Sequence, residues 1–364
     1  GAIPKNPFQW NAWIDHLLGQ MAYPNDDLEP AGVMDKLIFV PPWAKQEIYS
    51  RLVAALQEMG YKADPSQYAE ADRTLYTFDY DWRQDNRKSA AQLADAVARW
   101  QSFHPGAKPW IVAHSNGGLV ARWYIEKLGG KEHVGRLFLM GSPWDGSPKA
   151  LRMLFDGVVL LRQWPGLLDI AERTRSVVRT WPAACQLLPH VDPFLRAESN
   201  QTVALTDNLA WLDETGRALL ADGLRFTSEL DKATSVETLC FFGRAQPTNT
   251  GGLVHTDPGG GWERIDWSTT DAGDGTVPER AAVLPGSEEV LPFAVTHGEI
   301  YVNPDVLQKL QWELIGKFQL GTLAEMVVGG LDITFSPDKD SYAPGEPIPV
   351  AATVRRVQGG AAVR

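Results

Sequence analysis

The sequence has few of the residues that make a disulfide framework or a metal cluster. Its 364 residues include only two cysteines, Cys185 and Cys240, and neither belongs to a Cys-x-x-Cys pair. Two isolated cysteines provide neither a disulfide scaffold nor a zinc site. No HExxH segment and no clustered set of histidines and acidic residues occurs. We therefore expect neither a metal ion nor another cofactor.

Basic charge is scarce, and no long apolar run exists. Lys and Arg number 34 against 45 Asp and Glu, which gives a net charge of −11, and no basic run of five residues occurs. This balance argues against nucleic-acid binding. The sequence also has no stretch of about 18 apolar residues, the length that a membrane-spanning helix needs. The first ten residues lack the basic start and apolar run of a signal peptide. We expect a soluble protein, either cytoplasmic or secreted with its signal removed.

Short apolar runs alternate with amphipathic stretches through the first 140 residues. The pattern predicts strands over 37–40, 74–78, 110–113 and 136–140, separated by helices over 46–59, 88–103 and 118–128. Buried strands that alternate with helices are typical of a doubly wound, mostly parallel sheet. After residue 231 the expected elements are a strand over 238–242, a Gly-rich loop over 251–261, a short strand over 290–295 and a closing helix over 303–318.

Two segments depart from this alternation. Residues of about 144–231 have only short apolar runs and several proline breaks, which predicts a helical insertion packed over one edge of the sheet. Residues 331–364 alternate apolar and polar side chains around Pro344-Gly345 and resemble the first strands of a β-sandwich. We expect an α/β domain over 1–330 with a helical cap, followed by a short C-terminal β extension or the start of a second module.

The strongest chemical signal is Ala113-His114-Ser115-Asn116-Gly117-Gly118, placed between a predicted strand and a predicted helix. A serine at such a sharp turn, with small residues two positions before and after it, is typical of a nucleophile elbow. The turn exposes the hydroxyl of Ser115 above the sheet, and the following helix directs its positive end at a developing anion. The alternative is a plain strand–helix turn in which serine acts only as a cap.

A serine nucleophile needs a base and an acid, which follow it along the chain in this fold class. His297 comes after the last predicted strand and is the expected base; His190 and His255 are less suitably placed. The acid is expected in the preceding loop, where the candidates are Asp257, Asp266, Asp271 and Asp274. Asp274 is favoured because flanking glycines allow a turn that directs its carboxylate inward. The alternative is an Asp-Gly turn that only reverses the chain.

Four segments carry a family resemblance. They read FDYDWR at 78–83, AHSNGGLV at 113–120, GSPWDGS at 141–147 and GDGTVP at 273–278. In order and spacing they resemble the lecithin:cholesterol acyltransferase-like branch of the α/β-hydrolases, whose corresponding segments are YDWR, AHSMGGLV, GTPFxGS and GDGTVP. The resemblance covers about residues 37–315, including a cap segment over 181–189. It implies an α/β-hydrolase fold with a helical cap and an acyl-enzyme mechanism on lipid or other acyl esters.

The resemblance also implies an oxyanion hole and contacts to the substrate. Backbone N–H groups of Asn116 and Trp43 would supply the oxyanion hole. Pro42 stands where the family has glycine, and the alternative for Trp43 is a cover over the acyl site. Trp82 and Trp144 are candidates for the substrate pocket. The alternative for the first is that Asp81 and Arg83 brace the loop while Trp82 packs.

The sequence thus predicts a serine esterase, lipase or O-acyltransferase with Ser115, Asp274 and His297 as its catalytic residues. The alternative is a non-catalytic α/β-hydrolase scaffold that serves as a binding module of a larger protein. The sequence leaves the acyl length, the head group, protein partners and the choice between water and an alcohol as acceptor open.

Overall fold

The computed structural model describes residues 10–24, 32, 36–38, 45–47, 49–157, 168–191, 194–230, 233–289, 292–315, 325–328, 331–337, 350–358 and 361–363. They belong to two compact units, residues 1–302 and 303–364, which are described separately. The first unit carries the parallel sheet and every predicted catalytic residue.

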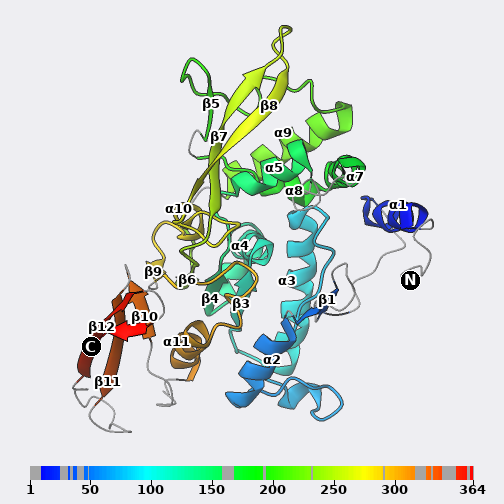
Figure 1. The fold of residues 1–364 in the computed structure, drawn as a ribbon. Coiled ribbons are helices and arrows are strands. Elements are labelled where there is room, and N and C mark those ends of the chain that lie inside the picture. Colours follow the sequence, from blue (N-terminus) through cyan, green and yellow to red (C-terminus); the bar gives the residue numbers. More distant parts are fainter. Residues whose placement is uncertain are drawn as a thin grey trace. The chain divides into compact units, whose positions relative to one another are not determined.

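A four-stranded parallel sheet lies at the centre of the first unit (Figure 1). Its strand order is β3-β4-β6-β9, with β3 at Trp110–His114, β4 at Arg136–Met140, β6 at Thr238–Phe241 and β9 at Glu288–Glu289. Every residue of β4 and β6 is buried. After their first residues, Arg136 and Thr238, both strands are apolar throughout, as expected where helices cover both faces of a parallel sheet. The predicted α/β fold, with its strands over 110–113 and 136–140, is confirmed.

Two helices, the amphipathic α3 (Asn86–Phe103) and the almost fully buried α4 (Asn116–Lys127), pack in the core beside this sheet. The Asp85 carboxylate caps α3 by accepting a hydrogen bond from the Arg87 backbone N–H at 2.9 Å. The inward stripe of α3 is Ala90, Leu93 and Val97, spaced by three and four residues. Helix α4 is buried from Gly118 to Ile125, so its position is set by packing on all sides.

The segment before α3 differs from the sequence prediction. Strand β1 (Lys36–Ile38) pairs antiparallel with β2 (Lys45–Glu47), and residues 39–44 lie outside the described residues. Helix α2 therefore begins at Tyr49 and ends at Glu58, three residues later than expected at its start. It is followed by the 3₁₀ turn η2 (Glu70–Asp72).

The predicted strand over 74–78 is wrong. The backbone N–H groups of Thr74 and Leu75 both donate to the Lys62 carbonyl, at 3.0 and 3.1 Å. The Thr74 hydroxyl in turn accepts from the Lys62 N–H at 2.9 Å. The start of this segment therefore pairs with the loop at Lys62 and not with a strand. The prediction of a strand rests on apolar alternation, which indicates burial but does not specify a partner strand.

The segment 144–231 is mostly helical where it is described. Its elements are α5 (Pro148–Asp156), α7 (Leu168–Val178), α8 (Pro182–Gln186), β5 (Leu195–Ala197) and α9 (Glu214–Glu229). Pro148 and Pro182 lie in the first turns of their helices, where proline is tolerated. The N-terminal helix α1 (Trp10–Met21) contacts this segment through an Asp15–Arg173 ion pair at 3.0 Å. Its C-terminal carbonyl at Met21 accepts from the Trp181 indole N–H at 2.7 Å.

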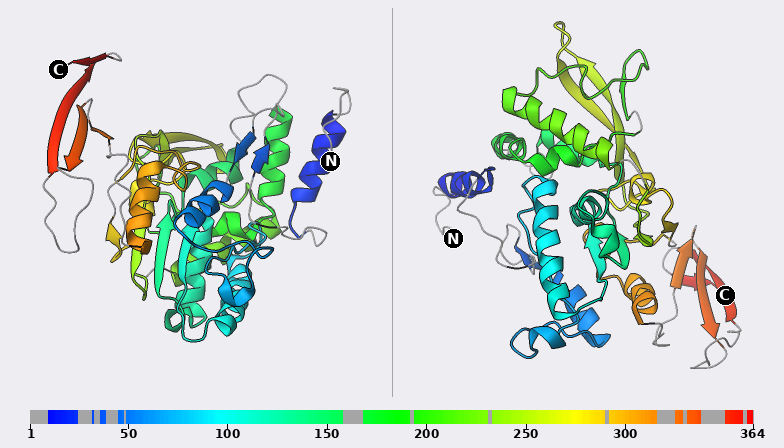
Figure 2. Two further views of the ribbon diagram at one scale, coloured as in Figure 1. Left: turned by 90° about the horizontal axis from the view of Figure 1, so that it is seen from below. Right: turned by 180° about the vertical axis from the view of Figure 1, so that it is seen from behind.

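The predicted Gly-rich loop over 251–261 is wrong for residues 251–256, whereas residues 257–261 form the turn of a hairpin. Residues Thr248–Thr256 form β7 and Trp262–Thr270 form β8, an antiparallel hairpin that pairs with β5 on its other edge (Figures 1 and 2). Glycine at 251 lets the backbone at Phe194 approach closely, because a Cβ at this position would overlap the Phe194 carbonyl oxygen. This hairpin and the helices of the insertion share a second hydrophobic core, in which Trp211 and Trp262 stack.

The end of the first unit contains α10 (Glu279–Ala282) and β9, which is shorter and earlier than the strand predicted over 290–295. Residues 290 and 291 lie outside the described residues, and Phe293 forms only a single bridge with Gly243. The apolar run over 290–295 predicts a longer strand, but within the described residues the pairing of β9 with β6 is limited to Glu288 and Glu289.

The second unit begins with α11 (Pro304–Ile315), where the closing helix was expected; residues 316–318 and the Pro344-Gly345 turn lie outside the described residues. Four antiparallel strands follow in the order β10-β11-β12-β13. They are β10 (Glu325–Val328), β11 (Leu331–Pro337), β12 (Val350–Gln358) and β13 (Ala361–Val363). Among the helices in the described ranges, none has the length and apolarity needed to cross a membrane.

Candidate active site

Ser115 occupies a sharp turn between β3 and α4. Its backbone has φ 52° and ψ −127°, a conformation that few non-glycine residues adopt and that costs about 1–3 kcal/mol. The turn is held by hydrogen bonds from the Ser115 N–H to the Met140 carbonyl and from the Gly118 N–H to the Ser115 carbonyl, both at 3.0 Å. Strain of this kind persists only where the surrounding structure enforces it, as expected of a nucleophile elbow.

The steric requirement in this turn falls on Gly118 more than on Gly117. A Cβ at Gly117 would meet only ordinary contacts, 3.7 Å from the Tyr80 hydroxyl and 3.9 Å from the Ala113 Cβ. A Cβ at Gly118 would overlap the side chain of Ser142 and lie 2.9 Å from a methyl of Leu139. The second glycine of the motif therefore lets α4 approach β4 closely.

His297 links Ser115 to Asp274. Its Nε2 lies 2.9 Å from Ser115 Oγ, and its Nδ1 lies 2.7 Å from Asp274 Oδ2. Because an ionised carboxylate can only accept, Nδ1 carries the ring proton and Nε2 presents a lone pair to the serine hydroxyl. The backbone N–H of His297 also donates to the Asp274 carbonyl at 2.8 Å. The structure thus brings together the three residues predicted as nucleophile, base and acid.

The Asp274 carboxylate is 2 % exposed and fully engaged. Its Oδ1 accepts from the backbone N–H groups of Thr276 and Val277, at 2.9 and 2.7 Å, which leaves Oδ2 for His297. Gly275 has φ +86°, and its N–H donates to the Thr248 hydroxyl at 2.8 Å. The glycines around Asp274 therefore allow a tight turn that aims one carboxylate oxygen at the imidazole.

The other acid candidates have different partners. Asp266 accepts from His255 Nε2 at 2.8 Å on the β7–β8 hairpin. Asp257 accepts from the N–H groups of Gly259 and Gly261 and so shapes the hairpin turn. The Asp271 backbone carbonyl accepts from Ala245. Of the four candidates, Asp274 is the one with a carboxylate oxygen in a recorded hydrogen bond to His297.

His114, which sequence reasoning missed, packs behind the base. Its Nε2 donates to the His297 carbonyl at 2.9 Å, and its Nδ1 accepts from the Tyr49 hydroxyl at 2.7 Å. Burial, and then the neighbouring His297, hold the pKa of His114 well below its ordinary value of 6.5. His114 therefore stays neutral near pH 7 and fixes the backbone of His297. Its only sequence signal is its place directly before Ser115.

Asn116 is the first residue of α4, so the helix itself offers no acceptor for its backbone N–H. Its side chain forms a reciprocal amide pair with Asn86, with N–O distances of 2.9 and 3.0 Å. Gln186 of α8 ties this pair to the segment 144–231 by accepting from the Asn86 N–H at 2.9 Å. Trp43, the other predicted oxyanion donor, lies outside the described residues.

The two tryptophans predicted for the substrate pocket lie in different surroundings. Trp82 is 39 % exposed and packs edge-to-face on Trp181, with ring centroids 4.9 Å apart. The Arg83 guanidinium donates to both carboxylate oxygens of Asp81, each at 2.8 Å, and also to the Gln20 carbonyl. The Arg83–Asp81 pair therefore braces the loop that carries Trp82. Trp144 donates from its indole N–H to the Arg280 carbonyl at 3.1 Å.

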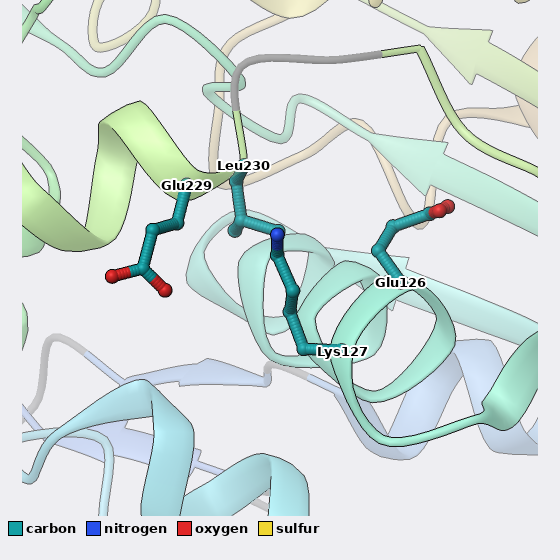
Figure 3. Close-up of a pocket in the computed structure, with 4 residues that line it drawn as sticks. All are labelled: Glu126, Lys127, Glu229 and Leu230. Atoms are coloured by element: carbon teal, nitrogen blue, oxygen red, sulfur yellow. The ribbon is translucent and has the colours of Figure 1, made fainter.

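A surface pocket of about 230 Å³ is lined by Glu126, Lys127, Glu229 and Leu230 (Figure 3). It lies at the C-terminal ends of α4 and α9, whereas Ser115 precedes the N-terminus of α4. A helix of 12 residues is about 18 Å long, so the pocket is remote from the Ser115 hydroxyl. It is not part of the site. Within the described ranges, no three His, Cys, Asp or Glu side chains are grouped to hold a metal ion.

Comparisons with known proteins place this geometry in context. The family model for lecithin:cholesterol acyltransferase matches residues 39–219. A search of curated proteins gave no match. The chain is similar to a chain in the crystal structure of the Tle4-Tli4 complex, with 16% identity over 83% of this chain and 79% of that chain and a TM-score of 0.48.

Two further solved structures are also similar to parts of this chain. The mature form of the Bacillus licheniformis lipase BlEst2 has 15% identity over 65% of this chain and 78% of that chain, with a TM-score of 0.39. The product of the gene lin2722 from Listeria innocua has 14% identity over 75% of this chain and 91% of that chain, with a TM-score of 0.37.

Proposed function

The chain belongs to the lecithin:cholesterol acyltransferase-like family of α/β-hydrolases, and on this premise we propose that it is a serine-dependent acyl-ester hydrolase or acyltransferase. The observation that carries the proposal is the hydrogen-bonded series Ser115 Oγ–His297 Nε2–Asp274 Oδ2, with distances of 2.9 and 2.7 Å. A strained serine at the start of α4 and a buried acid add to it.

The first half of the reaction forms an acyl-enzyme. His297 Nε2 takes the proton from Ser115 Oγ as this oxygen attacks the ester carbonyl carbon. The resulting oxyanion accepts hydrogen bonds from the backbone N–H of Asn116 and, as the family resemblance implies, of Trp43. His297 then gives its proton to the departing alcohol oxygen. Asp274 keeps accepting from Nδ1 and stabilises the imidazolium while it exists.

The second half releases the acyl group. Water, or an alcohol in an acyl transfer, loses its proton to His297 Nε2 and attacks the acyl carbonyl carbon. The tetrahedral intermediate collapses, Ser115 Oγ takes the proton back, and a carboxylic acid or a new ester leaves. His114 stays neutral throughout, so His297 is the imidazole that takes up and releases the proton in each step.

The segment 144–231 is proposed as a cap that shapes an apolar acyl site. Helix α8 contacts the nucleophile elbow through Gln186, Asn86 and Asn116, which supports a position above the site. The exposed Trp82 and its partner Trp181 provide an apolar contact where the loop before α3 meets this segment. The C-terminal strands from residue 331 onward are proposed as a β extension or part of a further module.

The acyl-chain dependence of hydrolysis tests this substrate class. Each CH₂ that enters an apolar site contributes up to about 0.8 kcal/mol. For p-nitrophenyl esters, kcat/KM should therefore rise from two acyl carbons to at least six and then reach a plateau. Parallel reactions with an added alcohol acceptor, analysed for the new ester, distinguish transfer from hydrolysis. A strict preference for acetyl esters, with a steep fall at butyryl, would contradict a lipid-type site.

A further inference from the structure

The loop that presents Asp274 is held from both sides. Every carbonyl from residue 273 to 277 accepts a hydrogen bond, three of them from the backbone N–H groups of Gln246, His297 and Asp274. The remaining two carbonyls, at Gly275 and Thr276, accept from side chains at the start of α5. Lys149 Nζ donates to the Gly275 carbonyl at 3.1 Å, and Ser147 Oγ donates to the Thr276 carbonyl.

Lys149 makes a second contact with the same loop. Its Nζ donates to the Thr276 hydroxyl at 3.0 Å, so one ammonium group bridges both residues that follow Asp274. Lys149 is half-buried in the first turn of α5. Burial lowers its pKa, and the negative charge of Asp274 partly offsets that change. The two contacts of Lys149 Nζ thus place a positive charge on the loop that carries the buried Asp274 carboxylate.

We propose that Lys149 is a positioning residue for the proposed active site: it clamps the loop that presents Asp274, and its positive charge favours neutral His297 beside ionised Asp274. The proposal rests on the proposed function of this site. Lys149 does not touch the substrate or the reacting atoms. It acts through the loop and through its charge.

The other groups around the Asp274–His297 pair do not supply this charge in the same way. Arg152, one turn further along α5, donates to Asn249 Oδ1 at 3.3 Å and faces Asp156. His114 is held neutral by burial. Other titratable or charged groups on neighbouring elements include Tyr49 of α2, Tyr301, Glu299, and Glu279 and Arg280 of α10. Glu299 accepts from the Thr296 hydroxyl, and Glu279 pairs with Arg244.

The sign of the expected pH effect follows from electrostatics. Removal of the Lys149 charge makes an imidazolium at His297 less unfavourable, so a higher pH is needed to obtain the neutral base. In Lys149→Met we expect the pH at which kcat/KM reaches half its maximum to rise by about 0.5–1 unit. We also expect kcat to fall about 10–100-fold with little change in KM, because the loop loses its clamp.

Three further variants separate charge, contact and general damage. Lys149→Arg keeps the charge and should return the midpoint of the pH profile to within about 0.2 unit of the wild type. Thr276→Val removes one acceptor but not the charge, so it should lower kcat without moving the midpoint. Lys127→Met, at the remote end of α4 (Figure 3), should match the wild type in both measurements.

The outcomes distinguish this inference from the proposed function. If folded Lys149→Met retains the wild-type midpoint, or if Lys149→Arg shifts as far as Lys149→Met, the charge role is wrong. If Lys149→Met does not fold, the comparison of Lys149→Arg with Thr276→Val decides, since a midpoint that moves in Thr276→Val contradicts the charge role. Full activity in Ser115→Ala would instead overturn the proposed function, whatever the lysine variants do.

Discussion

Replacement of Ser115 by alanine is expected to lower kcat/KM for p-nitrophenyl butyrate by at least ~10³-fold, because the nucleophile and its base act as one unit. The Oγ of Ser115 is the atom that His297 Nε2 contacts at 2.9 Å, and alanine lacks it. Alanine keeps the Cβ in the same strained turn and adds no new clash. The thermal unfolding midpoint should therefore change little, which steady-state kinetics and a thermal melt measure together.

Ser142 provides the matched control for this experiment. It is 2 % exposed in the loop after β4, and its hydroxyl has no hydrogen-bond partner among the described residues. Ser142→Ala should therefore keep near-wild-type turnover, although it too removes a buried serine hydroxyl close to α4. Near-full turnover in Ser115→Ala, or an equal loss in both variants, would contradict the assignment of Ser115.

Replacement of Asp274 by asparagine is expected to lower kcat by ~10³–10⁴-fold. The Asp274 carboxylate accepts from His297 Nδ1 at 2.7 Å and so keeps the lone pair of Nε2 directed at Ser115. An amide at this position can donate to Nδ1, which favours the tautomer whose Nε2 carries a proton. That imidazole cannot take the proton of Ser115. Single-turnover release of p-nitrophenol measures the acylation step directly.

Asp266→Asn is the control for the acid. Asp266 lies on β8, where its carboxylate contacts His255, and its loss should leave turnover within about twofold of the wild type. A large loss in Asp266→Asn or Asp271→Asn, together with an active Asp274→Asn variant, would mean that the acid has been misassigned.

The elements beside the nucleophile could be predicted because local and global signals agree there. Residues 137–140 of β4 are an unbroken apolar run that is completely buried, as a central parallel strand requires. Helix α3 has its apolar residues at helical spacing and an aspartate cap in front of them. The turn between β3 and α4 has its own sequence signature at Ser115, so a single motif locates strand, turn and helix together.

The elements that were predicted wrongly depend on partners far away in the sequence. Residues 74–78 have a strand-like composition, yet Thr74 and Leu75 pair with Lys62. Gly251 is typical of a loop, but it lies in strand β7, where the Phe194 carbonyl oxygen occupies the space that a Cβ would need. Neither partner can be identified from composition. Many apolar residues of the insertion pack in the core shared with this hairpin.

The same limit applies to the site. Ser115, Asp274 and His297 could be selected because each lies in a turn with its own pattern and because their order along the chain is restricted. Lys149 could not, since its partners Gly275 and Thr276 are 126 and 127 residues away. The contact of His114 with His297 could not be predicted either, because the motif does not indicate the direction of the side chain next to the nucleophile.

Covalent labelling with a fluorophosphonate tests the central claim most directly. The probe should add one phosphonyl group to the folded wild-type protein, and peptide mapping should place it on the Ser115 Oγ. Labelling should be absent in Ser115→Ala and strongly slowed in His297→Ala, because His297 Nε2 must take the serine proton. A wild-type protein that is folded yet unlabelled, or that carries the adduct on another residue, would contradict the account.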